Sequence, residues 1–361
     1  TGVLGNSSSR YPSISADGRY VAFDSFASNL VSGDRGYDFD VFVHDIVLGK
    51  TSRVSLTSSG REGNYSSIEP SISGDGRFVA FTSFADNLVL GDINLISDTF
   101  VRDRLNGLTF RVSEDPNGLG GNGASTSPHL SGDGLQLVYV SDASNLTDGD
   151  RNHKSDIFLY SLITEMTSRV SVDSDGVEGN SDCANPVISH DGRIIAFESL
   201  SDNLALIDLN DRADIFMHDW ATGQTRRLSV DSDGVEGNLA SRAPSITERG
   251  RVVVFESDSV NFFDGDSNEE FDIFATGPTY NPDANKVLLT GPFRSSTDEY
   301  TDLNWEDAPP NSFYWLVVSE NLAQTEMGGF VFDLGPPAIA INSGRNTIEG
   351  TGSFSLIPLP G

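Results

Sequence analysis

The chain has 361 residues, and its 53 acidic side chains against 23 basic ones give a formal net charge of −30. This charge argues against nucleic-acid binding through a basic face. The single cysteine excludes an intrachain disulfide, and no apolar run of about 18 residues is present that could span a membrane. Apolar residues form 37 % of the chain and recur at regular spacing, which favours a folded core over disorder.

The dominant feature of the sequence is a 58-residue repeat that occurs five times. Each copy opens with a proline-led segment, for example PSISADGRYVAF in the first copy and PVISHDGRIIAF in the fourth. The prolines are Pro12, Pro70, Pro128, Pro186 and Pro244. An asparagine column keeps the same spacing and consists of Asn29, Asn87, Asn145, Asn203 and Asn261. Self-similarity at a fixed period of this length indicates a repeat architecture.

Each copy contains four short runs that favour β-strands. In the first copy they are Pro12–Ser15, the apolar Tyr20–Phe23, Val41–Val43 and Arg53–Ser55. An Asp-Gly pair separates the first two runs, and this dipeptide tolerates the positive φ angles of a tight hairpin. Four antiparallel strands per copy, with little helical periodicity, predict the blades of an all-β propeller.

The motifs of the repeat resemble those of a known family. The pattern P-x-x-S-x-D-G-R-x-x-A-F, followed by D-I-F-x-x-D and T-x-R-V-S, resembles the WD40-like (PD40) repeats of TolB-type β-propellers. The likeness is strongest to long-repeat versions in secreted bacterial proteins and covers residues 1 to about 290. This resemblance implies an extracytoplasmic location and interactions with protein or matrix, and it carries no catalytic residue over to this chain.

The repeat divides the chain into two regions. Residues 1–290 are expected to form five four-stranded blades that start near residues 12, 70, 128, 186 and 244, and residues 291–361 a C-terminal β region. Two interpretations of the second region stay open, a degenerate sixth blade and a small Ig-like sandwich. Its last nine residues, Ser353–Gly361, are read either as a strand that closes the chain's own sheet or as one that is donated to a neighbour.

The loops between the second and third strands carry aspartate and asparagine at fixed positions. Calcium takes six to eight oxygen ligands from such side chains, so we expect Ca²⁺ at up to one site per blade. In the alternative interpretation, the same residues cap turns or bind backbone within the blade. The candidate ligands are Asp34 and Asp40 in the first loop, Asp92, Asn94 and Asp98 in the second, Asp150, Asn152 and Asp156 in the third, Asp208, Asn210 and Asp214 in the fourth, and Asp266, Asn268 and Asp272 in the fifth.

The remaining polar residues suggest structural roles. The repeated arginines are expected to form exposed ion pairs with acidic residues, each contributing about 0–1 kcal/mol; one such column is Arg53, Arg111, Arg169 and Arg227. His44 and His218 share a repeat position and are expected to pack within their blades. Cys183 is expected to be a structural thiol in a loop between blades.

These observations favour a secreted, non-catalytic, calcium-stabilised propeller that acts as an extracellular binding or interaction scaffold. Its expected partners are other proteins, extracellular matrix or polysaccharide, with no nucleic acid and no membrane span. One alternative is a structural subunit of an extracellular filament or surface layer that assembles through its C-terminal strand. Another is a polysaccharide hydrolase or lyase, which would need acids outside the repeat pattern, such as Asp298, Glu299, Glu306 and Asp307.

Overall fold

The computed structural model describes residues 4–35, 37–205, 208–263 and 270–276, together with the backbone of two further strands at 302–305 and 352–355. The first blade contains β1 (Ser9–Ile14), β2 (Tyr20–Ser25), β3 (Asp40–Asp45) and β4 (Lys50–Arg53). The second contains β5 (Ser67–Ile72), β6 (Phe78–Ser83), β7 (Asp98–Asp103) and β8 (Leu108–Arg111). The third contains β9 (Ser125–Leu130), β10 (Gln136–Ser141), β11 (Asp156–Ser161) and β12 (Met166–Arg169). The fourth contains β13 (Cys183–Ile188), β14 (Ile194–Ser199), β15 (Asp214–Asp219) and β16 (Gln224–Arg227). The fifth is described over β17 (Ser241–Ile246), β18 (Val253–Ser257) and β19 (Asp272–Thr276).

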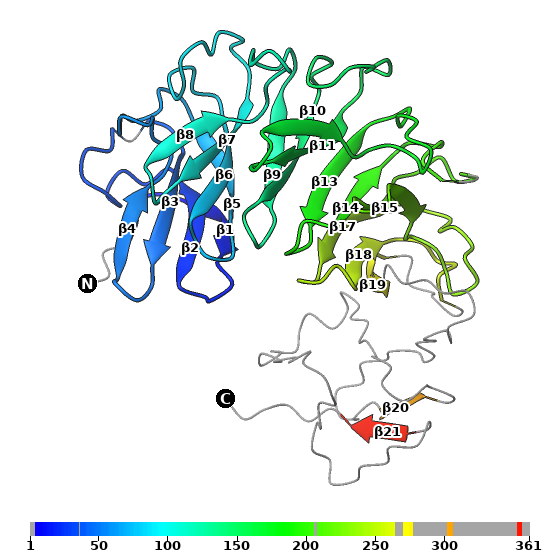
Figure 1. Ribbon diagram of the computed structural model, residues 1–361. Coiled ribbons are helices and arrows are strands. Elements are labelled where there is room, and N and C mark those ends of the chain that lie inside the picture. Colours follow the sequence, from blue (N-terminus) through cyan, green and yellow to red (C-terminus); the bar gives the residue numbers. More distant parts are fainter. Residues whose placement is uncertain are drawn as a thin grey trace.

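These elements confirm the predicted all-β propeller of successive blades. Within each sheet the strands pair antiparallel in chain order, and the five sheets follow one another around an arc (Figure 1). Among the residues that the structure describes, none forms a helix long and apolar enough to cross a membrane.

Most of the C-terminal region falls outside the described residues, and so do the sixth-blade and sandwich interpretations of 291–361. The two strands described there, β20 (Asp302–Trp305) and β21 (Gly352–Ser355), pair antiparallel through their backbones. Residues 353–355 of the predicted terminal strand therefore pair within the chain, and residues 356–361 lie outside the described part.

The core lies between neighbouring blades. Val41 and Val43 of the first blade pack against Val79, Phe81 and Phe100 of the second, and all five side chains are at most 1 % exposed. Burying a side chain of this size contributes about 1.5–3 kcal/mol relative to leaving it in water. Each blade thus depends on its neighbour to cover its apolar face, as expected for a repeat protein.

The described residues leave both ends of the arc uncovered. Ile14 is 61 % exposed, whereas Ile72, at the same repeat position in the second blade, is 6 % exposed. At the other end, Ile273 of the fifth blade is 38 % exposed, whereas Ile215 of the fourth is fully buried. The first and fifth blades therefore each present an apolar face that a further element could cover.

The first strand of every blade contains a β-bulge that the sequence pattern does not signal. One residue other than glycine has a φ between 50° and 54° at each bulge: Tyr11, Glu69, Ser127, Asn185 and Ala243. Such a conformation costs of the order of 1–3 kcal/mol and needs support from its surroundings. Carboxylates of neighbouring blades give this support, because the Glu69 amide donates to Asp24 Oδ2 at 3.1 Å and the Ser127 amide donates to Glu69 Oε2 at 3.1 Å.

The asparagine column lies on the side of the propeller that carries the long loops between the second and third strands of the blades, which we call the long-loop side. Its side chains join neighbouring loops there. In the fourth blade, the Asn203 Oδ1 atom accepts from the Asn180 amide at 2.9 Å, and Asn203 Nδ2 donates to the Glu178 carbonyl at 2.8 Å. Asn152 Nδ2 donates to the next carbonyl, that of Gly179, at 2.6 Å. These bonds hold the loop between β12 and β13, and with it Glu178, against two blades at once.

Substituting Asn203→Ala should lower the free energy of unfolding by about 1–3 kcal/mol, because two hydrogen bonds of about 0.5–1.5 kcal/mol each are lost. Urea denaturation followed by tryptophan fluorescence measures the change. Asn117→Ala is the matched control, since that side chain makes a single hydrogen bond of 3.4 Å at an exposed turn. Equal effects of the two substitutions would show that the asparagine column does not hold the loops together.

Candidate functional site

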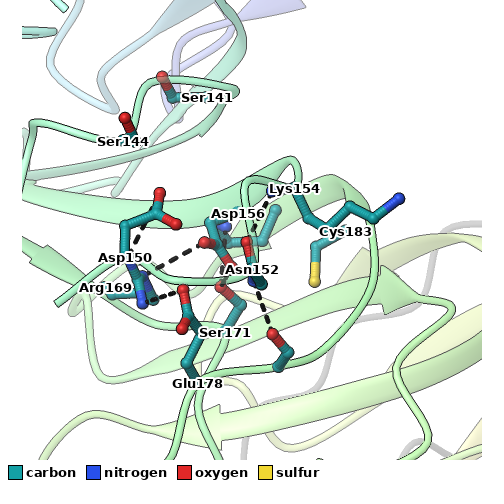
Figure 2. Close-up of polar contacts among 12 residues, drawn as sticks. Ser141, Ser144, Asp150, Asn152, Lys154, Asp156, Arg169, Ser171, Glu178 and Cys183 are labelled. Atoms are coloured by element: carbon teal, nitrogen blue, oxygen red, sulfur yellow. Dashed lines mark hydrogen bonds and ion pairs between the residues drawn. The ribbon is translucent and has the colours of Figure 1, made fainter. Parts of the chain in front are cut away.

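A cluster of three carboxylates around one arginine lies at the long-loop end of the third blade (Figure 2). Asp156 is the first residue of β11 and Arg169 the last of β12, while Asp150 and Glu178 come from adjacent loops. Arg169 Nη1 lies 2.6 Å from Glu178 Oε1, Nε lies 3.3 Å from Asp156 Oδ2, and Nη2 lies 3.6 Å from Asp150 Oδ2. The guanidinium therefore occupies the centre of the predicted calcium loop.

The same cluster occurs in the first and fourth blades. Arg53 contacts Asp34 at 2.9 Å, Asp40 at 3.4 Å and Glu62 at 2.6 Å. In the fourth blade, Arg227 contacts Asp214 at 3.0 Å and Glu236 at 2.9 Å, and Asp208 completes the carboxylate group. In each of the three clusters the carboxylate oxygens lie within 4.8 Å of one another, so these groups could hold a metal ion.

The second blade departs from this arrangement. Gly120 stands at the repeat position that carries glutamate in the other three blades. Arg111 contacts Glu114 at 3.2 Å instead, together with Asp92 at 3.3 Å and Asp98 at 3.5 Å. The second loop thus keeps its aspartates near an arginine, but it lacks the close group of three carboxylates found in the first, third and fourth blades.

The predicted asparagine ligands bind backbone in the described loops. Asn152 Oδ1 accepts from the Lys154 amide at 2.6 Å, and Asn210 makes the equivalent bond with the Arg212 amide at 2.6 Å. Asn94 donates to the Gly121 carbonyl at 3.1 Å and to Asp98 at 2.9 Å. These contacts match the turn-capping alternative. In the fifth loop, Asp266 and Asn268 lie outside the described residues, and Asp272 is the first residue of β19.

A serine two residues after each arginine fixes the orientation of the buried aspartate. Ser171 Oγ donates to Asp156 Oδ1 at 2.5 Å and accepts from the Ile157 amide at 3.1 Å. Ser229 and Asp214 repeat this contact at 2.6 Å. With Oδ1 held by the serine, Oδ2 is the oxygen that faces the arginine, and this explains the R-V-S and R-L-S segments of the repeat.

The sequence interpretation missed the glutamates of the clusters. Glu62, Glu178 and Glu236 precede the Gly-Asn pair of the inter-blade loop, whereas the second loop has Gly120 there. The recurrence of E-G-N in three loops was the available signal. It was not recognisable as part of the site, because the glutamate comes from the loop that leads into the next blade.

The expectation that this arginine column would form exposed pairs is wrong. The side chains of Arg53, Arg111, Arg169 and Arg227 are only 2–9 % exposed. Ion pairs in such a setting lose hydration, and removing one partner leaves an uncompensated buried charge. The column Arg19, Arg77 and Arg193, by contrast, forms partly exposed pairs with Asp45, Asp103 and Asp219, as expected.

Each cluster is short of positive charge. Three ionised carboxylates and one guanidinium sum to a charge of −2 per cluster. Burial raises the pKa of Asp40 and of Asp156 to about 6, although the serine and arginine contacts favour the ionised form. Burial likewise raises the pKa of Asp214 to about 7. Above these pH values, a divalent cation is the kind of ligand that would balance the charge.

Two further expectations concern single residues. Cys183 was expected in a loop, but it is the first residue of β13. It stands where the other blades have the serine of a buried cross-strand pair, and its Sγ lies 3.2 Å from Ser199 Oγ. Burial raises the pKa of this thiol to about 12, in keeping with a structural role. His44 and His218 each hydrogen-bond a threonine of the adjacent strand, Thr51 at 3.0 Å and Thr225 at 2.8 Å, which confirms their packing within the blades.

Substituting Arg169→Leu should lower the free energy of unfolding by about 3–5 kcal/mol at pH 8, since the buried Asp156 and the half-buried Asp150 and Glu178 lose their counter-charge. The loss should shrink at pH 5, where Asp156 is protonated. Thermal and urea unfolding at both pH values measure the effect. Arg193→Leu, which removes a more exposed pair with Asp219, is the control and should cost far less; a loss as large as that of Arg169→Leu would contradict this account.

Comparisons with known proteins assign no activity to this chain. No family model matches the chain, and neither does any curated protein. Among solved structures, TolB from Acinetobacter baumannii is 17 % identical, with a TM-score of 0.45 over 75 % of this chain and 52 % of its own. The β-propeller domain of the Trilobed protease from Pyrococcus furiosus is 11 % identical, with a TM-score of 0.46 over 76 % and 70 %. An oligogalacturonate lyase in complex with manganese is 12 % identical, with a TM-score of 0.45 over 76 % and 66 %. The chain thus spans about half of the first of these structures.

Proposed function

We propose that this chain is an extracellular, calcium-stabilised β-propeller that acts as a non-catalytic binding scaffold. The observation that carries the proposal is the group of three carboxylates, one buried and two half-buried, that recurs at one position in the first, third and fourth blades. A site that serves stability is expected to recur with the repeat, whereas a catalytic site usually combines residues found in one blade only.

The contacts within the clusters support a structural use of their side chains. In the third blade, Asp156 binds Ser171 and Arg169, and Arg169 binds Glu178 of the loop that enters the next blade. A cation bound to these carboxylates would therefore connect β11 and the loop before it with the loop that enters the following blade. Calcium suits the site because it accepts irregular sets of carboxylate, carbonyl and water oxygens.

Calcium should raise the unfolding temperature more at pH 8 than at pH 5. For an acid with a raised folded-state pKa, stability is greatest below the unfolded pKa of about 4 and falls as the pH rises through the folded value. The pH range over which this stability is lost therefore runs from about 4 to about 6 for Asp156 and from about 4 to about 7 for Asp214. Calcium binds the ionised form and offsets this loss, by about 2.7 kcal/mol per site at about 100 times the Kd. Circular dichroism melts in calcium or in chelator, at both pH values, measure the difference.

A matched pair of variants distinguishes calcium binding at the clusters from calcium binding to the acidic surface in general. Glu178→Gln removes one cluster carboxylate and should reduce the calcium-induced rise, while Glu165→Gln changes an exposed turn residue and should leave it unchanged. An unfolding temperature that does not respond to calcium at pH 8, or equal responses of the two variants, would overturn the calcium proposal.

One observation favours the alternative of a structural subunit. The first blade exposes Ile14 at a position that is at most 6 % exposed in the next three blades. In this alternative a second copy of the chain covers that face, whereas in the scaffold proposal the remainder of the same chain does so. Light scattering should give a mass near the 38.8 kDa monomer for the scaffold. A multiple of that mass which reverts to monomer on Ile14→Asp would favour assembly.

A further inference from the structure

The junction between the fourth and fifth blades contains a cavity of about 610 Å³ at the hairpin end of the sheets, away from the carboxylate clusters. Ile194 and Met217, which are 6 % and 4 % exposed, contribute its apolar surface. The hairpin residues Asp191, Glu248 and Arg249 line it together with Arg251. The cavity thus combines an aliphatic surface with charged groups of both signs.

The charge of this junction breaks the repeat. The first four blades place aspartate in the hairpin turn between their first two strands, and the residues are Asp17, Asp75, Asp133 and Asp191. In the fifth blade the same position is Arg249. The charge at this repeat position thus changes from negative in four blades to positive in the fifth, although the chain as a whole carries a net charge of −30.

A second arginine of the junction has lost its repeat partner. Arg193 pairs with Asp219 at 2.7 Å, and the equivalent pairs of the first two blades have the same geometry. Arg251 occupies this column in the fifth blade, but the sequence has Gly277 where Asp219 would be repeated. Within the described part of the chain, neither Arg249 nor Arg251 forms an ion pair.

The shape of the junction differs as well. Between the first two blades, a Cβ on Gly76 would lie 2.2 Å from the Tyr20 ring, so an aromatic side chain fills the space beneath the hairpin. Arg104 stacks on the same ring at 4.6 Å. Between the fourth and fifth blades, Ile194 takes the place of Tyr20. Ile194 also lies close beneath its hairpin, since a Cβ on Gly250 would be 2.6 Å from it, but this aliphatic side chain lines the cavity where the first junction has an aromatic ring and a stacked guanidinium.

We infer that this cavity binds a hydroxylated carboxylate of the sugar-acid class, such as a uronate unit of an acidic polysaccharide. Guanidinium groups recognise carboxylates through paired hydrogen bonds. Asp191 and Glu248 would repel a simple anion, but they accept hydrogen bonds from hydroxyl groups. The aliphatic surface of Ile194 and Met217 suits the C–H face of a sugar ring. This inference names a ligand class for the proposed scaffold and rests on that proposal.

An extended peptide fits the junction less well. Several backbone groups of the hairpins are already bonded: the His190 amide donates to the Glu248 carbonyl and the Gly250 amide donates to the Thr247 carbonyl, both at 2.8 Å. The Trp220 amide likewise donates to the Arg193 carbonyl at 2.8 Å. A peptide backbone would therefore find few partners here, whereas the hydroxyl and carboxyl groups of a sugar acid can use the side chains.

The test is isothermal titration calorimetry of the full chain with a digalacturonate, with cellobiose as the neutral disaccharide and tetraglutamate as the acidic peptide. Each titration is run in calcium and in chelator. The digalacturonate should bind, and Arg249→Asp, which restores the residue of the other four blades, should weaken binding at least tenfold. Arg251→Leu, which copies Leu135 of the third blade, should do the same. The control Arg77→Leu makes the equivalent change in the second blade and should leave the affinity unchanged.

The outcomes separate this inference from the proposed function. Absence of digalacturonate binding in both conditions, or equal affinity of wild type and Arg249→Asp, overturns the sugar-acid site. Binding of tetraglutamate that Arg249→Asp abolishes, without binding of the digalacturonate, overturns it in favour of an acidic peptide. Calcium-dependent melting is measured on the same samples, so the scaffold's calcium dependence stands or fails independently of the ligand.

Discussion

The neutralisation of a buried aspartate at the start of the third strand is the interaction on which the rest of each of the first four blades depends. Asp156 is fully buried, and it is stabilised only because Ser171 and Arg169 both reach it from the end of the fourth strand. The arginine then extends to Glu178 in the loop that leads into the next blade. One charged group therefore connects the edge strand, the interior strand and the loop that leads into the neighbouring blade.

The strands and hairpins could be predicted from the sequence because their signals are local. The apolar run Tyr20–Phe23 and the Asp17-Gly18 turn lie within a few residues of one another, and Gly18 has the positive φ of 69° that such a turn requires. Repetition strengthens these signals, since five copies must share one geometry if they are to stack. The apolar contacts between Val43 and Phe81 follow from the same pattern, because every blade needs its neighbour to cover its face.

The candidate site was only partly predictable because it joins residues whose relation is tertiary. Asp150 and Asp156 lie in one loop and could be recognised as acidic neighbours, but Glu178 is more than twenty residues away and enters from the next blade. The burial of Arg169 gave no sequence signal, since the column of Arg193 repeats equally regularly and is partly exposed. The bulge at Glu69 was hidden for another reason: residues of five different types occupy that position, and the support for its strained backbone comes from Asp24 of the preceding blade.

Comparison of the fifth blade with the first four shows which of its residues depart from the repeat. Its structural contacts are retained, as Ser241 still bonds Ser257 at 2.9 Å and Phe255 still stacks on Phe274 with 6.0 Å between ring centroids. The changes are therefore not a general decay of the blade. One of them, Arg249, lies in a hairpin that lines the cavity, whereas others lie elsewhere, such as Gly277 at the repeat position of Asp219. Since aspartate occupies this position in the other four blades, the arginine of the fifth is the change on which the inferred ligand site depends.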